Sequence, residues 1–344
     1  MRAGVYRGVR DMAVEEVAEP ELGPGDVIIA VKACGICGSD LHVYTEGGPP
    51  IDPGQVMGHE FAGEVSAVGA GVEGIIVGDR VAGFPVLACG NCRRCREGMR
   101  SLCDNWIGRS IGFGLPGAFA ERVRIPGAVL GENVFVLPDA LSFADGALVE
   151  PLAVGVRAAD QAQLVPGQTA AVFGLGAIGI LLAQVLRARG VSAVVGVNRS
   201  PLRRAIAEQL GITVIEGGDS LPARVRAALG GREADVVFEA SGAPDLVQAA
   251  LDTVCPGGTV IMLALYERPA SILPTLITTK ELTIRGSVTY LPGQFAEAIE
   301  LLASGRVAGQ SLITRRLPLA DLARAFEEQL DKAASVKVMI TMDQ

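Results

Sequence analysis

The chain of 344 residues is poor in histidine, of which it has two, and in aromatic residues, which make up 4%. It also lacks an excess of positive charge, because 38 acidic side chains outnumber 30 basic ones and the formal net charge is −8. Nucleic acids and anionic membrane surfaces attract a basic protein surface. We therefore expect neither a nucleic acid nor a membrane as a partner.

Long hydrophobic runs are missing as well. The longest, residues 170–183, has 14 residues and contains three glycines, whereas a helix that crosses a bilayer needs about 20 apolar residues. The first residues, MRAGVYRGVRDMAVEE, show neither an apolar core nor a small-residue cleavage site. The sequence therefore predicts no signal peptide, and the expected location is the cytoplasm.

The length suits about two domains at roughly 150 residues each, and hydrophobic residues, at 49%, can fill a core in both. Residues 1–150 contain short runs rich in valine and isoleucine, separated by glycine and proline. This pattern is typical of a small β-barrel or sandwich. The expected strands lie at 26–33, 60–69, 78–83 and 118–125.

The pattern changes at residue 151. From there to residue 285, apolar strands alternate with helical stretches, which predicts a doubly wound parallel sheet. The expected strands are 170–174, 193–197, 234–240 and 258–265, and the expected helices are 177–190, 201–211 and 244–254. Residues 286–344 add helices at 294–305 and 319–332 and a strand at 335–342. The predicted fold class is α/β, with a β-rich domain and a parallel-sheet domain.

A glycine motif lies between the first apolar strand of the second segment and the helix that follows it. The motif is Gly174-Leu175-Gly176-Ala177-Ile178-Gly179. The first glycine permits a tight turn, the second lets backbone N–H groups approach a pyrophosphate, and the third allows close packing of the helix. The helix then points its positive end at the phosphates. The motif predicts that these residues bind a dinucleotide cofactor.

The end of the next strand carries Asn198, Arg199 and Ser200, where an NAD-binding enzyme usually has an acidic residue. Without that carboxylate nothing repels a 2′-phosphate, and arginine offers paired donors for it. The alternative is that Arg199 and the nearby Arg203 and Arg204 only solvate the start of a helix. We expect NADP in preference to NAD.

Four of the seven cysteines, Cys89, Cys92, Cys95 and Cys103, fall within 15 residues. In a reducing compartment such a cluster is more typical of a metal site than of disulfides, although a redox role is an alternative. The short spacings from Cys89 to Cys92 and from Cys92 to Cys95 let three thiolates point at one centre. The longer segment between Cys95 and Cys103 brings the fourth thiolate back to the same centre. Four thiolates leave no position for water, so the pattern predicts a structural zinc ion in a lobe at residues 86–106.

A second candidate metal site involves one of the two histidines. Cys37 and His59, with a carboxylate from Glu60 or Glu150, offer sulfur, nitrogen and oxygen ligands. Such a set leaves one position of a tetrahedron for water or substrate, as a catalytic zinc ion requires.

Three residues beside Cys37 complete a candidate catalytic set. Ser39 can form a hydrogen bond with an alcohol, and His42 can pass its proton to solvent because the pKa of histidine is near neutral. Asp40 can orient His59. Each of these residues alone would be ordinary, so the prediction rests on the whole set.

These motifs together resemble the zinc-dependent medium-chain dehydrogenases over essentially the whole chain. The matching segments are GICGSDLH (35–42), GHEFAGEV (58–65), GDRV (78–81), CGNCRRCREGMRSLC (89–103), EPLAV (150–154) and VFGLGAIG (172–179). The resemblance implies a GroES-like catalytic domain at 1–150, a Rossmann domain at 151–285, and a segment at 286–344 that completes the catalytic domain. It also implies a homo-oligomer, with a tetramer favoured over a dimer.

Glu150 stands where the alcohol dehydrogenases proper have a second cysteine, so the chain looks like the polyol, threonine and butanediol dehydrogenase branch. That branch implies zinc ligands at Cys37, His59 and Glu60, with Glu150 bound directly or through water. It also implies cofactor contacts at Leu263, Ala264, Leu265, Ser287 and Val288. Thr289 stands where sorbitol dehydrogenases carry an arginine that helps to grip a polyol, which favours simpler secondary alcohols and diols.

The predicted function is therefore zinc-dependent hydride transfer between NADP(H), or NAD(H), and a small secondary alcohol, diol or polyol. The alternatives are a zinc-free quinone or enoyl reductase on the same scaffold and a non-catalytic sensor that binds zinc and nucleotide. The metal content distinguishes the predicted function from the zinc-free reductase. The prediction requires two zinc ions per subunit, one catalytic and one structural, whereas the zinc-free reductase would contain none.

Overall fold

The computed structural model describes residues 1–48 and 51–342. They divide into two compact units, each with its own hydrophobic core. Unit 1 comprises Met1–Glu150, Leu291–Ala303 and Leu312–Gln344, and unit 2 comprises Pro151–Tyr290 and Ser304–Ser311. Among the described residues, no helix combines the length and the apolar character that crossing a membrane requires.

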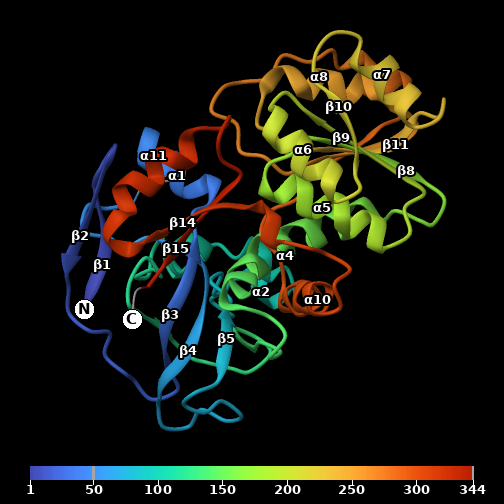
Figure 1. The fold of residues 1–344 in the computed structure, drawn as a ribbon. Coiled ribbons are helices and arrows are strands. Elements are labelled where there is room, and N and C mark those ends of the chain that lie inside the picture. Colours follow the sequence, from blue (N-terminus) through green and yellow to red (C-terminus); the bar gives the residue numbers. More distant parts are fainter. Residues whose placement is uncertain (49–50, 343–344) are drawn as a thin grey trace. The chain divides into compact units, whose positions relative to one another are not determined.

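A mainly antiparallel sheet forms the centre of unit 1. Its strands pair in the order β14 (Ile313–Pro318), β15 (Lys337–Thr341), β3 (Val27–Gly35), β4 (Glu60–Val68), β5 (Arg80–Gly83) and β7 (Val134–Val136), and β6 (Arg122–Ile125) pairs with β3. The C-terminal strands, red in Figure 1, thus lie beside the blue β3. Met339 is opposite Gly35, and Gly35 is opposite Glu60. Three segments that are distant in sequence therefore meet at one end of the sheet.

Shorter elements surround this sheet. They are the hairpin β1 (Arg2–Gly8) and β2 (Asp11–Glu16), the helices α1 (Gly38–Glu46), α10 (Pro292–Ala303) and α11 (Leu322–Leu330), the turn η3 (Leu319–Asp321), and a lobe with α2 (Arg93–Arg96), η1 (Arg100–Leu102) and α3 (Trp106–Arg109). Phe326 on α11 packs against Tyr44 on α1 and against Phe119, with ring centroids 5.0 and 5.7 Å away. These buried rings fasten both helices to the core.

Unit 2 is built on a parallel sheet. In the described residues the strands follow the order β10 (Thr213–Glu216), β9 (Ala193–Asn198), β8 (Thr169–Phe173), β11 (Ala234–Glu239), β12 (Val254–Met262) and β13 (Thr283–Gly286). The winding reverses between β8 and β11, and open sheets of this kind bind ligands at such a point.

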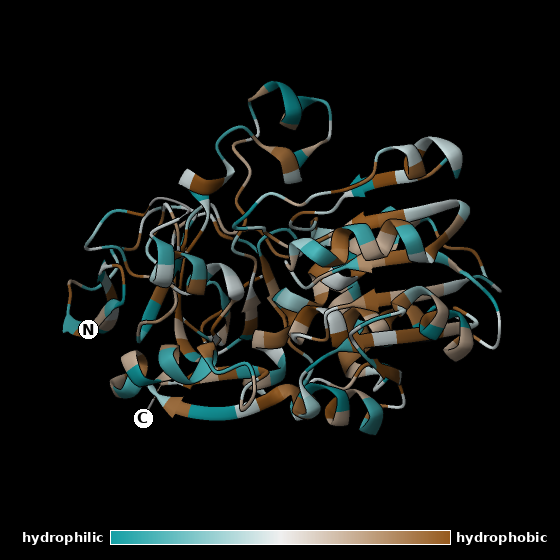
Figure 2. Ribbon diagram, turned by 90° about the horizontal axis from the view of Figure 1, so that it is seen from above, coloured by the Kyte–Doolittle hydropathy of each residue, from teal (hydrophilic) through white to brown (hydrophobic). Residues whose placement is uncertain are grey.

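Helices cover both faces of the parallel sheet. Figure 1 shows α5 (Ala177–Ala188) and α6 (Pro201–Gln209) on one face and α7 (Leu221–Ala228) and α8 (Pro244–Thr253) on the other. The central strands, covered on both faces, are mostly hydrophobic along their length (Figure 2). α5 is buried at every residue from Gly179 to Leu186, whereas α6 and α7 each bury only two residues. The short helix α9 (Thr275–Thr279) precedes β13, and the turn η2 (Gln310–Leu312) precedes β14.

The predicted α/β fold class is confirmed, but individual elements differ from the prediction. The long helix α4 (Phe143–Ala162) was not predicted, because Pro151 interrupts its sequence pattern. The strand expected at 118–125 begins only at Arg122.

The chain also crosses between the units more often than the predicted boundaries allow. The prediction assigns the whole of 286–344 to the first domain, whereas residues 286–290 and Ser304–Ser311 belong to unit 2. Hydrogen bonds explain the difference. Ser287 N donates to Met262 O at 2.9 Å, and the Gln184 side chain bonds both backbone groups of Ala308.

Candidate metal centres and cofactor site

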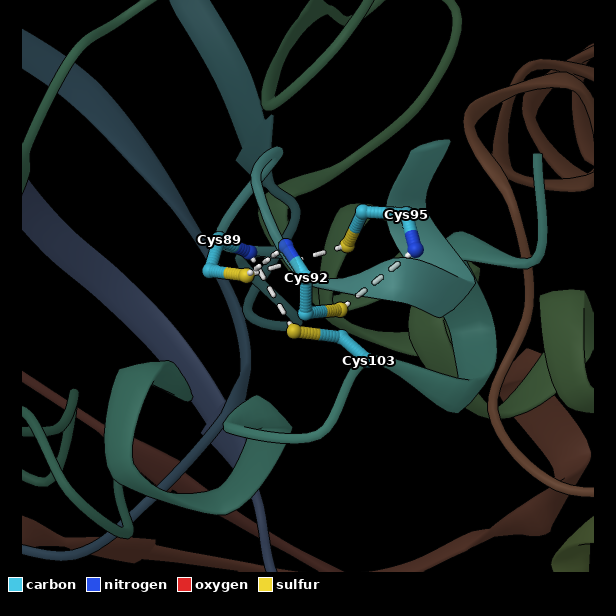
Figure 3. A group of neighbouring side chains, drawn as sticks. All are labelled: Cys89, Cys92, Cys95 and Cys103. Carbon is cyan, nitrogen blue, oxygen red and sulfur yellow. Dashed lines mark hydrogen bonds between the residues drawn. The ribbon is translucent and has the colours of Figure 1, made fainter. Parts of the chain in front are cut away.

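The four clustered cysteines point their sulfur atoms at one another (Figure 3). All four Sγ atoms, from Cys89, Cys92, Cys95 and Cys103, lie within 4.8 Å of each other. Cys92 caps α2, so the helix turn carries Cys95 round to the same centre, and Cys103 follows η1. This arrangement suits a four-coordinate ion of the size and softness of zinc.

Backbone N–H groups in the lobe donate to these sulfur atoms. Cys92 N donates to Cys89 Sγ at 3.3 Å, Cys95 N to Cys92 Sγ at 3.4 Å, and Cys89 N to Cys103 Sγ at 3.3 Å. Hydrogen bonds from the backbone of Asn91 and Cys92 lower the pKa of the Cys89 thiol to about 6. Burial and the neighbouring thiols raise the pKa of Cys95 to about 12. A metal ion would release the protons that the crowded thiols retain.

A second group of metal-binding atoms lies at the end of the sheet in unit 1. One ligand atom each from Cys37, His59 and Glu60 lies within 4.8 Å of the others. Cys37 caps the N-terminus of α1, His59 immediately precedes β4, and Glu60 begins that strand. The pairing of Glu60 with Gly35 at the end of β3 brings the two loops together.

Asp40 orients this group. Its Oδ2 accepts a hydrogen bond from Cys37 N at 2.9 Å, and its Oδ1 lies 3.3 Å from His59 Nδ1. Burial disfavours the charged imidazole, but Asp40 and Cys37 outweigh burial and raise the pKa of His59 well above its usual value. A proton and a metal ion compete for the same ring nitrogen, so the surroundings that attract one attract the other. With Nδ1 facing Asp40, Nε2 is left for a metal ion.

The remaining predicted residues of this site lie in the same unit. Ser39 Oγ is 3.5 Å from His59 Nε2, so it lies beside the metal-binding atoms. His42 is half-buried on α1, three residues further along the helix. Glu150 is buried on α4, but its carboxylate does not belong to the group within 4.8 Å. The structure thus brings Glu60 closer to Cys37 and His59 than Glu150.

In unit 2 the glycine motif forms a tight turn after β8. Gly174 has φ +97°, and a Cβ there would lie 2.7 Å from the backbone of Ser241. A Cβ on Gly179 would lie 1.9 Å from Gly174 O. Close backbone contact therefore requires glycine at both positions. The helix α5 begins immediately after Gly176, and the N–H groups of its first turn have no partner within the helix.

The loop after β9 holds the predicted coenzyme-selecting residues. Ser200 caps α6, and its N–H donates to Asn198 Oδ1 at 2.8 Å. Arg199 is exposed and its stem lies against Gly217. Arg204 binds the carbonyls of Asn198 and Arg199 and pairs with Glu216. Arg199 is therefore the arginine of this loop that extends toward solvent.

The other predicted cofactor contacts lie after β12 and β13. The N–H groups of Leu263 and Ala264 bind Glu239 O, Leu265 is exposed, and Val288 is exposed as well. Ser287 is buried, and its Oγ has no hydrogen-bond partner among the described residues. An unsatisfied buried hydroxyl at the edge of the sheet where nucleotides bind fits a ligand group.

Comparisons with known proteins identify the family of the chain. Residues 23–138 match the family described as "Alcohol dehydrogenase GroES-like domain", and residues 177–304 match "Zinc-binding dehydrogenase". The (R,R)-butanediol dehydrogenase of Bacillus subtilis (strain 168) is 36% identical to this chain. The alignment covers 99% of this chain and 99% of that enzyme. The chain belongs to the zinc-dependent medium-chain dehydrogenase family. It is therefore a zinc-dependent oxidoreductase.

Two further relatives of this dehydrogenase share nearly the whole chain. The sorbitol dehydrogenase of Bacillus subtilis (strain 168) is 34% identical over 99% of this chain and 97% of its own. The crystal structure of a zinc-binding dehydrogenase from Sinorhizobium meliloti 1021 bound to NADP superposes with a TM-score of 0.91. It is 33% identical and covers 99% of this chain and 98% of its own.

From the sequence, Arg203 was named only as a residue that solvates the start of a helix, and Lys337 was missed altogether. The Arg203 guanidinium lies beside Gly176, where a Cβ would be 3.9 Å from its Nη1, and burial lowers its pKa. Lys337 is buried with its ammonium group on Glu60. Burial opposes its charge, but Glu60 and Cys37 raise its pKa. The sequence signal for Arg203 is its position five residues after Asn198, the last residue of β9. Lys337 gives none, because it lies in an ordinary alternating strand.

Proposed function

We propose that the protein catalyses reversible hydride transfer between NADP(H) and a secondary alcohol or diol, or the corresponding ketone. The observation that supports this most directly is the group formed by Cys37, His59 and Glu60, with Ser39 beside it. A zinc ion held there would polarise the hydroxyl group of the alcohol as a Lewis acid. Substitution of Cys37 or His59 by alanine should abolish turnover and leave the fold intact. Near-wild-type activity of either variant in metal-free buffer would contradict the proposal.

We assign the proton transfer to residues of α1. Ser39 Oγ is close enough to the metal-binding atoms to accept the hydroxyl proton, and His42, on the same helix, can pass it to solvent. Ser39→Ala should therefore lower kcat while the Cys37–His59–Glu60 group still retains its metal ion. Equal kcat values in the variant and the wild type would remove Ser39 from the pathway.

We propose two zinc ions per subunit, a structural one in the cysteine lobe and a catalytic one at Cys37, His59 and Glu60. Metal analysis of the purified protein should give about two zinc ions per chain, because the lobe is closed and the second group offers three ligands. Cys103→Ala and Cys37→Ala should each remove one ion. A metal-free but active protein would instead support a zinc-free reductase on this scaffold.

We propose NADP as the preferred coenzyme. Asn198 leaves the strand end without a negative charge, and Arg199 reaches solvent beside it. Arg199→Ala should raise the KM for NADP much more than the KM for NAD, and Asn198→Asp should reverse the preference. Equal effects of Arg199→Ala on both coenzymes would refute the role of a 2′-phosphate.

The substrate class that we favour is a small secondary alcohol or vicinal diol. The relatives are named for butanediol and sorbitol, and in this chain Thr289 replaces an arginine expected to grip a polyol. A panel of ketones, diols and polyols with NADP and NADPH tests the choice. We expect higher kcat/KM values for short diols than for sorbitol, and the reverse order would contradict it.

We propose that the protein forms homo-oligomers, with a tetramer favoured. β13 is an edge strand of the parallel sheet, each of its residues is exposed, and Ile284 is among the exposed large hydrophobic side chains. Such an edge is a template for pairing with a second copy. Light scattering after gel filtration should give a multiple of the chain mass, and Ile284→Lys should reduce it. A monomeric wild type would refute the assembly.

We place the protein in the cytoplasm, since its seven cysteines are free thiols and those of the lobe bind metal only when reduced. Cell fractionation tests this location, and recovery of the protein with its cysteines oxidised would contradict it.

A further inference from the structure

Glu239, the last residue of β11, is a fully buried carboxylate in unit 2. Its Oε1 accepts the N–H of Ser241 at 3.0 Å and also the Ser241 hydroxyl group. Its Oε2 accepts the N–H of Gly242 at 3.3 Å and the hydroxyl group of Tyr266. A buried carboxylate is costly unless other groups replace its bonds to water. Here backbone N–H groups and hydroxyl groups replace them on both oxygens.

These donors come from two segments that follow neighbouring strands of the parallel sheet. The loop at 240–243, after β11, supplies both backbone N–H groups and one hydroxyl group, and the segment after β12 supplies Tyr266. The carbonyl oxygen of Glu239 also accepts the N–H groups of Leu263 at 2.9 Å and Ala264 at 3.3 Å. Glu239 therefore joins the two segments through both its side chain and its backbone.

The loop at 240–243 packs tightly on both of its sides. On one side it meets the glycine turn, where a Cβ on Gly174 would lie 2.7 Å from the Cα of Ser241. On the other side, a Cβ on Gly242 would lie 2.7 Å from the carbonyl oxygen of Leu265. A displacement of this loop would therefore disturb the turn before α5 and the expected coenzyme contacts at 263–265 together.

We propose that Glu239 is a positioning residue for the coenzyme. It fixes the loop at 240–243 between the glycine turn and residues 263–265, so that both hold their coenzyme-binding groups in place before the coenzyme arrives. The inference rests on the proposed function, in which unit 2 binds NADP(H). Because Glu239 is fully buried, it acts through its neighbours and not by contact with the coenzyme. Groups that are ordered in advance lower the entropic cost of binding.

Glu239→Gln tests the proposal, because glutamine has the same shape and no charge. Whichever way its amide is turned, the NH₂ group faces a backbone N–H, that of Ser241 or that of Gly242, which can only donate. The loop must then shift. We expect the Kd for NADPH, measured by fluorescence titration of the purified protein, to rise about tenfold. An unchanged Kd would overturn the proposal.

Asp235→Ala is the control for stability. Asp235 lies near the opposite end of β11, where its Oδ2 accepts the N–H and the hydroxyl group of Thr169 at 2.7 and 2.8 Å. The variant loses these bonds at the edge of the sheet that is remote from the glycine turn. Its melting temperature should fall while the Kd for NADPH stays unchanged. An equal rise of the Kd in Asp235→Ala and Glu239→Gln would assign the effect to lost stability and overturn the proposal.

Two milder variants cover the case in which Glu239→Gln does not fold. Tyr266→Phe and Ser241→Ala each remove one hydroxyl group from the carboxylate, on opposite oxygens and from different segments. Each should raise the Kd for NADPH by about fivefold. A rise in only one of them would indicate a direct contact of that residue with the coenzyme and overturn the role of Glu239. Failure of the proposed function has a different signature, since the wild type would then bind neither NADPH nor NADH.

Discussion

Asp40 supports the Cys37–His59–Glu60 group in two ways, and Asp40→Asn separates them. One oxygen accepts the N–H of Cys37 at 2.9 Å and caps α1, and the other lies 3.3 Å from His59 Nδ1. The amide oxygen of asparagine can replace the first interaction. It cannot replace the second, because an amide has no charge and its other end is an NH₂ group, which would compete with the Nδ1 proton.

The size of each effect follows from these contacts. The asparagine side chain can still cap α1. We therefore expect the free energy of unfolding to fall by no more than about 1 kcal/mol, which is the typical cost of losing a cap completely. Partners behind a metal-bound histidine change metal affinity by about 10- to 100-fold. A factor of ten in affinity corresponds to about 1.4 kcal/mol. The free energy of metal binding at the site should therefore become about 1.4 to 2.7 kcal/mol less favourable. Urea unfolding measures the first quantity, and zinc retention against a chelator measures the second.

Asp26→Asn is the matched control. Asp26 is buried in the same unit, and its two oxygens accept the N–H groups of Gly127 and Gly23, at 3.0 and 3.2 Å, away from the metal-binding atoms. It should reduce stability and leave zinc retention unchanged. If Asp40→Asn retained zinc within threefold of the wild type, Asp40 would be a helix cap and nothing more.

Three further outcomes follow from the structure. Gly179→Ala places a Cβ 1.9 Å from Gly174 O. Because the turn must then shift, the KM for the coenzyme should rise by about 100-fold. An unchanged KM in initial-rate assays would contradict this. If the lobe holds the proposed zinc ion, a chelator should expose residues 86–106 to proteolysis, and equal cleavage rates with and without chelator would count against a structural ion. Burial and the hydrogen bond to Glu327 raise the pKa of Tyr44 to about 12, above its unfolded value of about 10, so their stabilisation is complete below pH 10 and lost as the pH rises toward 12. Tyr44→Phe should remove this alkaline loss in urea titrations, and persistence of the loss would assign it to another group.

The sequence predicted the elements whose hydrophobic pattern is undisturbed. β8, α5 and β9 lie within one or two residues of their predicted bounds, because strand and helix periods alternate there without interruption. α4 was missed for the opposite reason, since Pro151 interrupts its pattern. A local signal was present, because Ser142 and Asp145 form the reciprocal bonds of a capping box at its start.

The candidate site was predictable only as far as motifs extend. Cys37, His59 and Glu60 belong to short local patterns, and the structure brings them together. Lys337 belongs to none, since it alternates with valines and such a lysine normally faces solvent. Its burial depends on pairing across β15, β3 and β4, and on the space above Gly35, which no local pattern encodes.

The charges around the Cys37–His59–Glu60 group give an independent reason to expect a divalent cation there. Asp40 and Glu60 are buried carboxylates at this group, and Lys337 is the buried ammonium group that pairs with Glu60. Two negative charges against one positive charge leave a net charge of −1, and loss of the Cys37 proton on metal binding would make it −2. Buried charge without compensation is strongly unfavourable. A proton on His59 would offset only part of this excess, whereas a divalent cation bound to Cys37 and His59 would offset all of it. A bound divalent cation would therefore stabilise the residues that hold it.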